Sequence, residues 1–292
     1  MKDQENKKNN KFINTILFLI IIFILLCLYA RIIEPKLLII KEYKVESETL
    51  PSNFDGIKIV HFSDLYYYST TSEEDLKKLV DKINLVKPDI VVFTGNIVSP
   101  SSSLKEEDKD IIIELFKEID ATLGKYIVKG NSDYKLKDYE EIVNKSEFIL
   151  LDNSYDLIYN NGYTPIFIAG LSSSTKSVVD FPKAFSYYSV NEEKINGAEY
   201  KILLFSESDL ADDALSYDPS VNLMLSGNSL NGYINLFNIN QYLTPEGSKK
   251  YYKNEYMLGS SYLFVSSGIG TNTLKYRFNN MPSFNIYRLK TI

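Results

Sequence analysis

The chain of 292 residues carries 32 Lys and Arg against 38 Asp and Glu, a net charge of −6, and 45% of its residues are hydrophobic. This composition is typical of a globular protein, and it argues against nucleic acid as a partner, because phosphate contacts need clustered basic residues. The single cysteine, Cys27, excludes an internal disulfide and a cysteine zinc site, and the single histidine, His61, excludes sites built from several imidazoles.

Residues 12–30 form a stretch of 19 residues without a charged side chain, preceded by a basic tail at residues 1–11. A helix needs about 20 apolar residues to cross a bilayer, whereas the apolar part of a cleaved signal peptide has about 7–15. We therefore expect residues 12–30 to be an uncleaved, single-pass transmembrane anchor in the cell membrane.

The basic residues beside this stretch predict its orientation. Four lysines lie within ten residues before it, and only Arg31 and Lys36 lie as close after it. Lys and Arg near a span are enriched on the cytoplasmic side, so the pattern favours a globular domain outside the cell. The alternative is a cytoplasmic domain tethered to the inner leaflet.

Residues 31–54 contain two prolines and alternating apolar residues, which predicts a linker and an edge strand before a globular domain at residues 55–292. In the first half of this domain, buried strands are expected to alternate with helices: strands at 57–62, 89–94 and 125–129, helices at 73–86 and 104–121. Ser72 and Asp75 have the spacing of a capping box at the start of the first helix.

The second half of the domain is rich in short apolar runs, with one short helix near residues 209–215. Strands are predicted at 165–169, 200–205, 221–225, 262–265 and 284–289. The alternation in the first half indicates right-handed crossovers and neighbouring strands with helices on the sheet faces.

Four polar turns follow predicted strands, at residues 63–66, 95–97, 130–133 and 227–230. Functional residues in sheets of this kind lie on loops at the carboxyl ends of the strands. The turns are therefore expected to cluster in space and to form a polar cleft.

These four turns, in this order, resemble the calcineurin-like metallophosphoesterases, whose pattern reads Asp-x-His, Gly-Asp, Gly-Asn-His-Asp, a lone His, and Gly-His-x-His. The lead-in at residues 55–65 and the Ser-Ser-Gly-Ile-Gly-Thr run at 266–271 are similar to the membrane-associated bacterial branch. The resemblance implies an α/β fold, a sandwich of two mixed β-sheets flanked by helices. It also implies, in active relatives, phosphoester hydrolysis at a pair of Mn, Fe or Zn ions.

The family's ligand positions, carried over by this resemblance, fall on eight residues: Asp64, Tyr66, Asn96, Asn131, Ser132, Ser206, Asn228 and Leu230. Only Asp64 and Asn131 keep the family's residue type. Asn96 replaces the carboxylate that bridges both metals, and Leu230 offers no donor atom. Tyr66 is a phenol with a pKa of about 10 and a poor ligand at neutral pH. Replacing facing aspartates by amides also removes a repulsion that metal ions would otherwise offset.

We therefore expect a membrane-anchored binding or scaffold module without catalysis and without a bound cofactor, whose partner is an unknown protein or a phosphorylated ligand. The alternative is an active phosphoesterase with a reduced site, in which Asp64 and Asn131 hold one metal ion. A metal titration and its dependence on Asp64 distinguish the two hypotheses.

Two further features have a structural and a functional interpretation. His61, on an apolar strand, is either a base or metal ligand or, as we expect, a hydrogen-bonded structural residue. Residues 207–213 carry four carboxylates, which form either a Ca or Mg site or, as we expect, a solvated charge run at a helix start.

Overall fold

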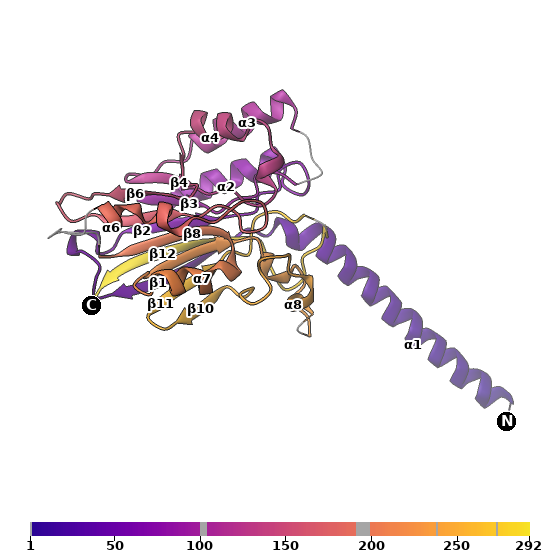
Figure 1. Ribbon diagram of the computed structural model, residues 1–292. Coiled ribbons are helices and arrows are strands. Elements are labelled where there is room, and N and C mark those ends of the chain that lie inside the picture. The colour runs from indigo at the N-terminus through magenta and orange to yellow at the C-terminus, as the bar shows by residue number, and fades with distance from the viewer. Residues whose placement is uncertain (1, 100–103, 191–198, 238, 273) are drawn as a thin grey trace.

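The computed structural model describes residues 2–99, 104–190, 199–237, 239–272 and 274–292. It begins with a long helix, α1 (Lys2–Leu28), which projects away from the rest of the molecule (Figure 1). A π-helical turn (Tyr29–Ile33) and a 3₁₀ turn (Glu34–Lys36) continue this helix toward the domain. Within the described residues, one segment, Asn10–Lys36, is long and apolar enough to cross a membrane.

The first sheet is mixed and has the strand order β1-β12-β2-β3-β4-β5. Its strands are β1 (Ile39–Ser47), β2 (Lys58–Phe62), β3 (Ile90–Phe93), β4 (Gly124–Ile127), β5 (Ile149–Leu150) and β12 (Ser283–Thr291). β2 to β5 are parallel, and β12 runs antiparallel to β2. β1 is an edge strand that pairs in parallel with β12, which places the start of the domain beside its end.

The second sheet is also mixed, with the order β10-β11-β9-β8-β7-β6. Its strands are β6 (Ser154–Ile158), β7 (Ile166–Gly170), β8 (Lys201–Glu207), β9 (Leu223–Gly227), β10 (Glu255–Leu258) and β11 (Ser261–Val265). The four central strands are parallel, and the edge strands β6 and β10 are antiparallel to their neighbours. This arrangement confirms the predicted pair of mixed sheets.

The two sheets pack face to face, with helices on both outer faces. Inward side chains such as Val92 of β3 and Leu204 of β8 form one apolar core between the sheets. α2 (Glu73–Leu85), α3 (Glu106–Lys117) and α4 (Tyr139–Lys145) cover the first sheet. α5 (Phe181–Ala184), α6 (Ser186–Val190) and α7 (Ala211–Tyr217) cover the second. α8 (Asn240–Leu243) lies at the end of the domain from which α1 emerges (Figure 1).

The second half holds more elements than the sequence predicted. α5, α6 and α8 have only four or five residues each, too few to show a helical repeat. The strands β5, β6 and β10 lie at or near sheet edges and are mostly half-buried or exposed, so they lack the apolar run of a central strand. The expectation of a single short helix in this half was therefore wrong.

Hydrogen bonds fix the segment after α1, residues 29–36, to the domain; this segment is called the root of α1 below. The amide N–H of Arg277 donates to the carbonyl oxygen of Ala30 at 2.9 Å. The buried carboxylate of Glu34 accepts a bond of 2.5 Å from the amide N–H of Asn280. Helix α1 therefore continues into the domain through specific contacts within a few residues of its apolar end.

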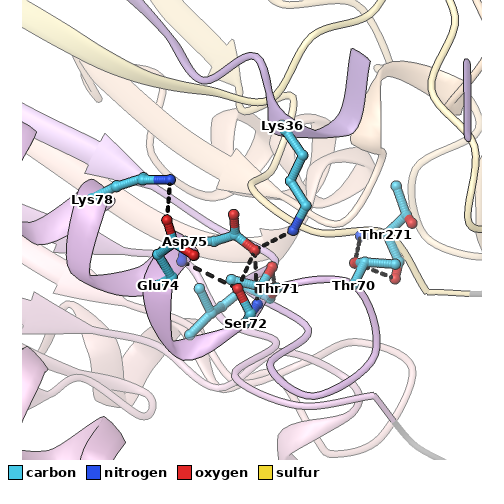
Figure 2. Close-up of polar contacts among 9 residues, drawn as sticks. Lys36, Thr70, Thr71, Ser72, Glu74, Asp75, Lys78 and Thr271 are labelled. Atoms are coloured by element: carbon cyan, nitrogen blue, oxygen red, sulfur yellow. Dashed lines mark hydrogen bonds and ion pairs between the residues drawn. The ribbon is translucent and has the colours of Figure 1, made fainter. Parts of the chain in front are cut away.

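Figure 2 shows a second attachment of the same segment. Lys36 pairs with Asp75, whose carboxylate also accepts from the backbone N–H of Ser72 at 2.9 Å. Ser72 and Asp75 form the capping box of α2 that the sequence predicted. Nearby, the N–H of Thr271 donates to the Thr70 hydroxyl at 2.7 Å, which joins the loop after β2 to the loop after β11.

Candidate functional site

The predicted polar turns meet at the carboxyl ends of the central strands of both sheets. The N–H of Asp64, after β2, donates to the carbonyl oxygen of Gly95, after β3, at 2.8 Å. The N–H of Tyr66 donates to the carbonyl oxygen of Asn96 at 3.2 Å. The N–H of Asn228, after β9, donates to the Asp64 carboxylate at 2.9 Å and joins the second sheet to the first.

Glycines allow these turns to approach one another closely. A Cβ atom on Gly130 would lie 2.4 Å from the side-chain oxygen of Asn96, and one on Gly227 would lie 2.8 Å from the Cβ of Ser63. Larger residues at these positions would separate the turns. The glycines of the polar turns therefore allow the backbones of neighbouring turns to pack closely against one another.

Asp64 is fully buried, and both of its carboxylate oxygens are engaged by protein donors. Oδ1 accepts from the amide of Asn96 at 2.8 Å, while Oδ2 accepts from the Ser63 hydroxyl at 2.5 Å and from the N–H of Asn228. Burial raises the pKa of Asp64, and these donors act in the opposite direction. The carboxylate is thus satisfied by hydrogen bonds within the protein.

The amide of Asn96 links Asp64 to the third turn. Its nitrogen donates to Asp64, and its oxygen accepts from the N–H of Ser132 at 3.0 Å and from the Ser132 hydroxyl at 2.7 Å. An ionised aspartate at this position could not donate the first of these bonds. The amide is therefore suited to a network that holds together through hydrogen bonds alone.

Asn131 and Asn228 lie together at the edge of this network, with 3.5 Å between the Asn131 amide nitrogen and the Asn228 amide oxygen. The Asn228 amide nitrogen donates to the carbonyl oxygen of Glu246 at 3.0 Å and to the Ser248 hydroxyl at 3.2 Å. These contacts attach the turn after β9 to the loop after α8.

The side chain of Leu230 is fully buried in an apolar cluster with Tyr66 and Tyr233. Burial raises the pKa of Tyr66 well above its usual value, and the nearby Asp64 carboxyl adds to this effect. The phenol therefore stays neutral, and this side of the site is packed with apolar atoms.

Seven of the eight predicted positions thus lie within one set of contacting turns. Ser206, near the end of β8, is buried, and its hydroxyl has no hydrogen-bond partner among the described residues. A bulge interrupts the pairing of β8 and β9 between Phe205 and Glu207. The correspondence of all eight positions to the family's metal ligands stays a prediction.

Five of these residues are non-glycines with positive φ: Asp64 (53°), Tyr66 (45°), Asn96 (68°), Asn228 (62°) and Leu230 (50°). The left-handed region is unfavourable for side chains other than Asn and Asp, by about 1–2 kcal/mol per residue. For Tyr66 and Leu230 the surrounding contacts must hold a conformation that the residue itself disfavours.

Asp133 and Arg277 are central to the site but were not singled out in the sequence. The buried carboxylate of Asp133 accepts from the N–H groups of Gly130, Asn96 and Ile97 at 2.7–2.8 Å, and burial raises its pKa to about 7. Asp133 ends the polar turn at residues 130–133, and this position could have identified it as a candidate site residue from the sequence.

Arg277 had no such signal, because it lies beyond the Ser-Ser-Gly-Ile-Gly-Thr run at residues 266–271, in a part of the loop between β11 and β12 for which we identified no motif. Its guanidinium is fully buried and donates to the carbonyl oxygens of Ser267 at 2.9 Å, Gly268 at 3.1 Å, Gly270 at 2.7 Å and Asn280 at 3.1 Å. Burial lowers its pKa to about 10, and the charge of Asp64 opposes this shift. A permanent cation of the chain therefore lies near the retained carboxylate.

The residues of this site do not fit a pair of bound metal ions. The oxygens of Asp64 already accept three hydrogen bonds, Asn96 carries no charge, and Leu230 fills its position with carbon atoms. In the part of the chain that the structure describes, no cluster of three or more His, Cys, Asp or Glu side chains is placed to hold a metal ion.

His61 lies behind the site and is fully buried between β3 and β12. Its Nε2 atom lies 2.8 Å from the Thr94 hydroxyl, and its Nδ1 atom lies 3.2 Å from the Tyr287 hydroxyl. Burial lowers its pKa to about 3, so the ring is neutral at physiological pH. These contacts support the structural interpretation of this histidine.

The acidic run at residues 207–213 differs from the expectation of a solvated cluster. Glu207 is buried and accepts from the hydroxyls of Ser173 at 2.5 Å and Thr175 at 3.1 Å. Burial raises its pKa. Asp212, by contrast, is exposed and pairs with Lys250. The solvated interpretation was therefore wrong for Glu207, because this residue is the last position of β8, a strand that is buried at successive positions.

A pocket of about 200 Å³ opens beside this network. Its lining residues are Tyr66, Asn131, Lys135, Lys176, Asn228, Tyr233, Pro245 and Asn272. The lining contains two lysines, and no carboxylate from the described residues contributes to it. Neither Lys135 nor Lys176 forms an ion pair within the described part of the chain.

The sequence profile of the calcineurin-like phosphoesterase family matches residues 57–256. The chain also shares 32% identity over 264 residues with the uncharacterized metallophosphoesterase YkuE of Bacillus subtilis, covering 90% of this chain and 89% of that protein. The protein therefore belongs to the calcineurin-like phosphoesterase family, as the four turns predicted.

Three further matches have lower sequence identity to this chain. A transmembrane protein with a metallophosphoesterase domain from Danio rerio is 26% identical, over 79% of this chain and 53% of that protein. The UDP-2,3-diacylglucosamine pyrophosphatase LpxG of Chlamydia trachomatis is 29% identical, over 54% of this chain and 46% of that protein. The structure of the phosphoesterase YfkN from Bacillus subtilis aligns with a TM-score of 0.45 at 11% identity, over 73% and 81% of the two chains.

Proposed function

We propose that this protein is a membrane-anchored binding module that uses the calcineurin-like fold without catalysing phosphoester hydrolysis. One observation carries this proposal: the retained carboxylate of Asp64 is buried and fully engaged by donors of the chain. A two-metal hydrolase needs such oxygens free to coordinate its metal ions. Those ions activate water and stabilise the leaving group.

The pocket supports an anionic, phosphorylated ligand as the bound species. Lys135 and Lys176 bring two positive charges to its lining, and the amide of Asn131 lies beside them. Cations and amide donors are suited to phosphate oxygens, which accept several hydrogen bonds at once. Such a site would bind a phosphate group through the protein alone.

The second candidate is a phosphoesterase that acts with a reduced metal site. It is favoured by the retention of Asp64 and Asn131 and by relatives named as metallophosphoesterases or as a pyrophosphatase. In this candidate a metal ion would displace the donors that now contact Asp64. Metal affinity therefore separates the two candidates.

Calorimetric titration of the full-length protein in detergent micelles tests the choice. Manganese is expected to give no binding heat up to millimolar concentration at neutral pH, whereas inorganic phosphate binds and gives heat that is lost in the Lys135→Gln/Lys176→Gln double variant. Lys78→Gln, an exposed lysine on α2, is the matched control and leaves phosphate binding unchanged.

Manganese binding that disappears in Asp64→Ala, together with turnover of a phosphodiester that the same variant abolishes, would establish the phosphoesterase candidate instead. Phosphate heat that persists in the double lysine variant would place the anion elsewhere on the molecule.

We also propose that the domain lies on the outer face of the cell membrane. The excess of lysines before the apolar stretch supports this orientation. Protease added to intact cells is then expected to digest the domain, while a domain that survives until the cells are opened would lie in the cytoplasm.

A further inference from the structure

Large apolar side chains are exposed at the end of the domain from which the anchor emerges. Phe237 is 89% exposed and Tyr242 is 77% exposed, and Ile239 between them is also exposed. They belong to the loop before α8 and to α8 itself, which lie close to the root of α1 in Figure 1. Water is an unfavourable environment for such a group of neighbouring apolar side chains.

Hydrogen bonds connect this loop to the anchor. The N–H of Asn235 donates to the carbonyl oxygen of Phe278 at 2.8 Å, and the N–H of Phe278 donates to that of Tyr233 at 3.2 Å. The neighbouring Arg277 bonds to Ala30, which is the last residue of the uncharged stretch. A stretch of 19 helical residues is about 28 Å long, close to the thickness of the hydrocarbon core. If residues 12–30 span the bilayer, Ala30 lies at its surface, and the hydrogen bonds through Arg277 and Phe278 hold the loop near that level.

The charges at this level match a lipid surface. Arg31 donates to the carbonyl oxygen of Lys275 at 3.0 Å, and its guanidinium lies 5.2 Å from the ring centre of Tyr276. Both Lys275 and Tyr276 are exposed. Cations contact lipid phosphates, and tyrosine rings are enriched at the boundary between headgroups and acyl chains.

We propose that Phe237, Ile239, Tyr242 and Tyr276, with Arg31 and Lys275, form a membrane-facing surface that rests on the lipid bilayer around the anchor. The apolar side chains enter the boundary between headgroups and acyl chains, and the two cations contact lipid phosphates. This inference rests on the anchoring that the proposed function includes, but not on the absence of catalysis.

The membrane-facing surface also determines where the pocket lies. Tyr233 and Pro245, which line the pocket, flank the segment that carries Phe237 and Tyr242. If that segment lies on the bilayer, the pocket is held close to the headgroups. The ligand class that this position favours is a phosphorylated lipid headgroup, and free phosphate in the calorimetric titration reports on the same chemistry without the lipid.

Tryptophan fluorescence tests the inference directly, because the chain contains no tryptophan. Single-tryptophan variants of the full-length protein are reconstituted in phosphatidylcholine–phosphatidylglycerol vesicles with brominated acyl chains. We expect Phe237→Trp to show quenched emission at shorter wavelength than in water, and Tyr242→Trp to show the same as an independent reporter. Tyr163→Trp is the matched control. It is 97% exposed in the turn between β6 and β7, at the opposite ends of the strands, and should stay unquenched.

Phe23→Trp, in the middle of the anchor, separates failure of this inference from failure of anchoring. A quenched Phe23→Trp with unquenched Phe237→Trp and Tyr242→Trp would show an inserted anchor and a surface that does not touch lipid, which overturns the inference. An unquenched Phe23→Trp would overturn the inference and the anchoring together. Quenching of Tyr163→Trp as strong as that of Phe237→Trp would also overturn it, because contact would then not be specific to this surface.

Discussion

Replacing Asn96 by aspartate is expected to lower the free energy of unfolding by about 3–5 kcal/mol near neutral pH. The substitution removes the donor to Asp64 and places two carboxyl groups at the separation of the present hydrogen bond, 2.8 Å, in a fully buried site. Without a bound cation, two carboxylates at this distance cannot both ionise. Urea denaturation of the full-length protein in detergent measures the loss.

The loss in Asn96→Asp should depend on pH. One of the two carboxyls keeps its proton in the folded state, so its folded pKa lies above its unfolded value, as burial already causes for Asp64. The stability of the variant is therefore present at low pH and is lost as pH rises through that raised pKa. We expect the variant to approach the wild-type protein near pH 4 and to differ most from it at pH 8.

Ser132→Ala is the control for this experiment, because it removes one donor to the Asn96 side-chain oxygen without adding a charge. It should cost about 1 kcal/mol and show no added dependence on pH. Wild-type stability of Asn96→Asp at pH 8, or strong stabilisation of wild-type protein by manganese, would contradict the proposal of a metal-free site.

Replacing Arg277 by leucine is expected to be equally damaging, with a loss of about 3–5 kcal/mol. The guanidinium donates to four carbonyl oxygens in the loops around β11 and β12. Leucine would remove the donor to those of Ser267, Gly270 and Asn280, whereas that of Gly268 also accepts from the N–H of Ser283 at 3.3 Å. It would also remove a cation that lies near Asp64. Thermal and urea unfolding of the variant measure the effect.

Arg288→Leu is the matched control, because Arg288 pairs with Glu42 on the surface of the first sheet. A solvent-exposed ion pair contributes little, so this loss should be about 1 kcal/mol or less. Arg277→Lys should fall between the two, since an ammonium keeps the charge but not the planar set of donors. Equal losses for Arg277→Leu and Arg288→Leu would show that the buried hydrogen bonds do not stabilise the loops.

The framework of the domain was predictable because its signals are local. The β-branched run at residues 57–62 became β2, and the helix predicted at 73–86 is α2, with its capping box in place. Central strands and amphipathic helices repeat one burial pattern over many residues, which the sequence displays directly. The clustering of the polar turns followed from the same framework, because carboxyl ends of parallel strands share an edge.

The hydrogen-bond network of the site was not predictable from the sequence. Some of its partners are distant along the chain and meet only in the folded state, as Asp64 and Asn228 do, or Arg277 and Glu34. The hydrophobic periodicity of a sequence does not indicate which polar atoms will face each other. The sequence identified Asp64 as a retained ligand type, yet its engagement by three donors depends on the geometry of three turns. Short elements such as α8 and β10 were missed for a similar reason, since tertiary contacts determine them.

The positive φ angles at Tyr66 and Leu230 have a consequence for the history of this fold. The backbone of these turns is held by main-chain hydrogen bonds, such as those from Asp64 to Gly95 and from Tyr66 to Asn96, which do not depend on side-chain identity. Main-chain contacts that a side-chain substitution leaves in place therefore contribute to the course of the backbone through these turns. A change of ligand set in such a fold therefore requires substitutions in these turns, but it does not require a new course of the backbone.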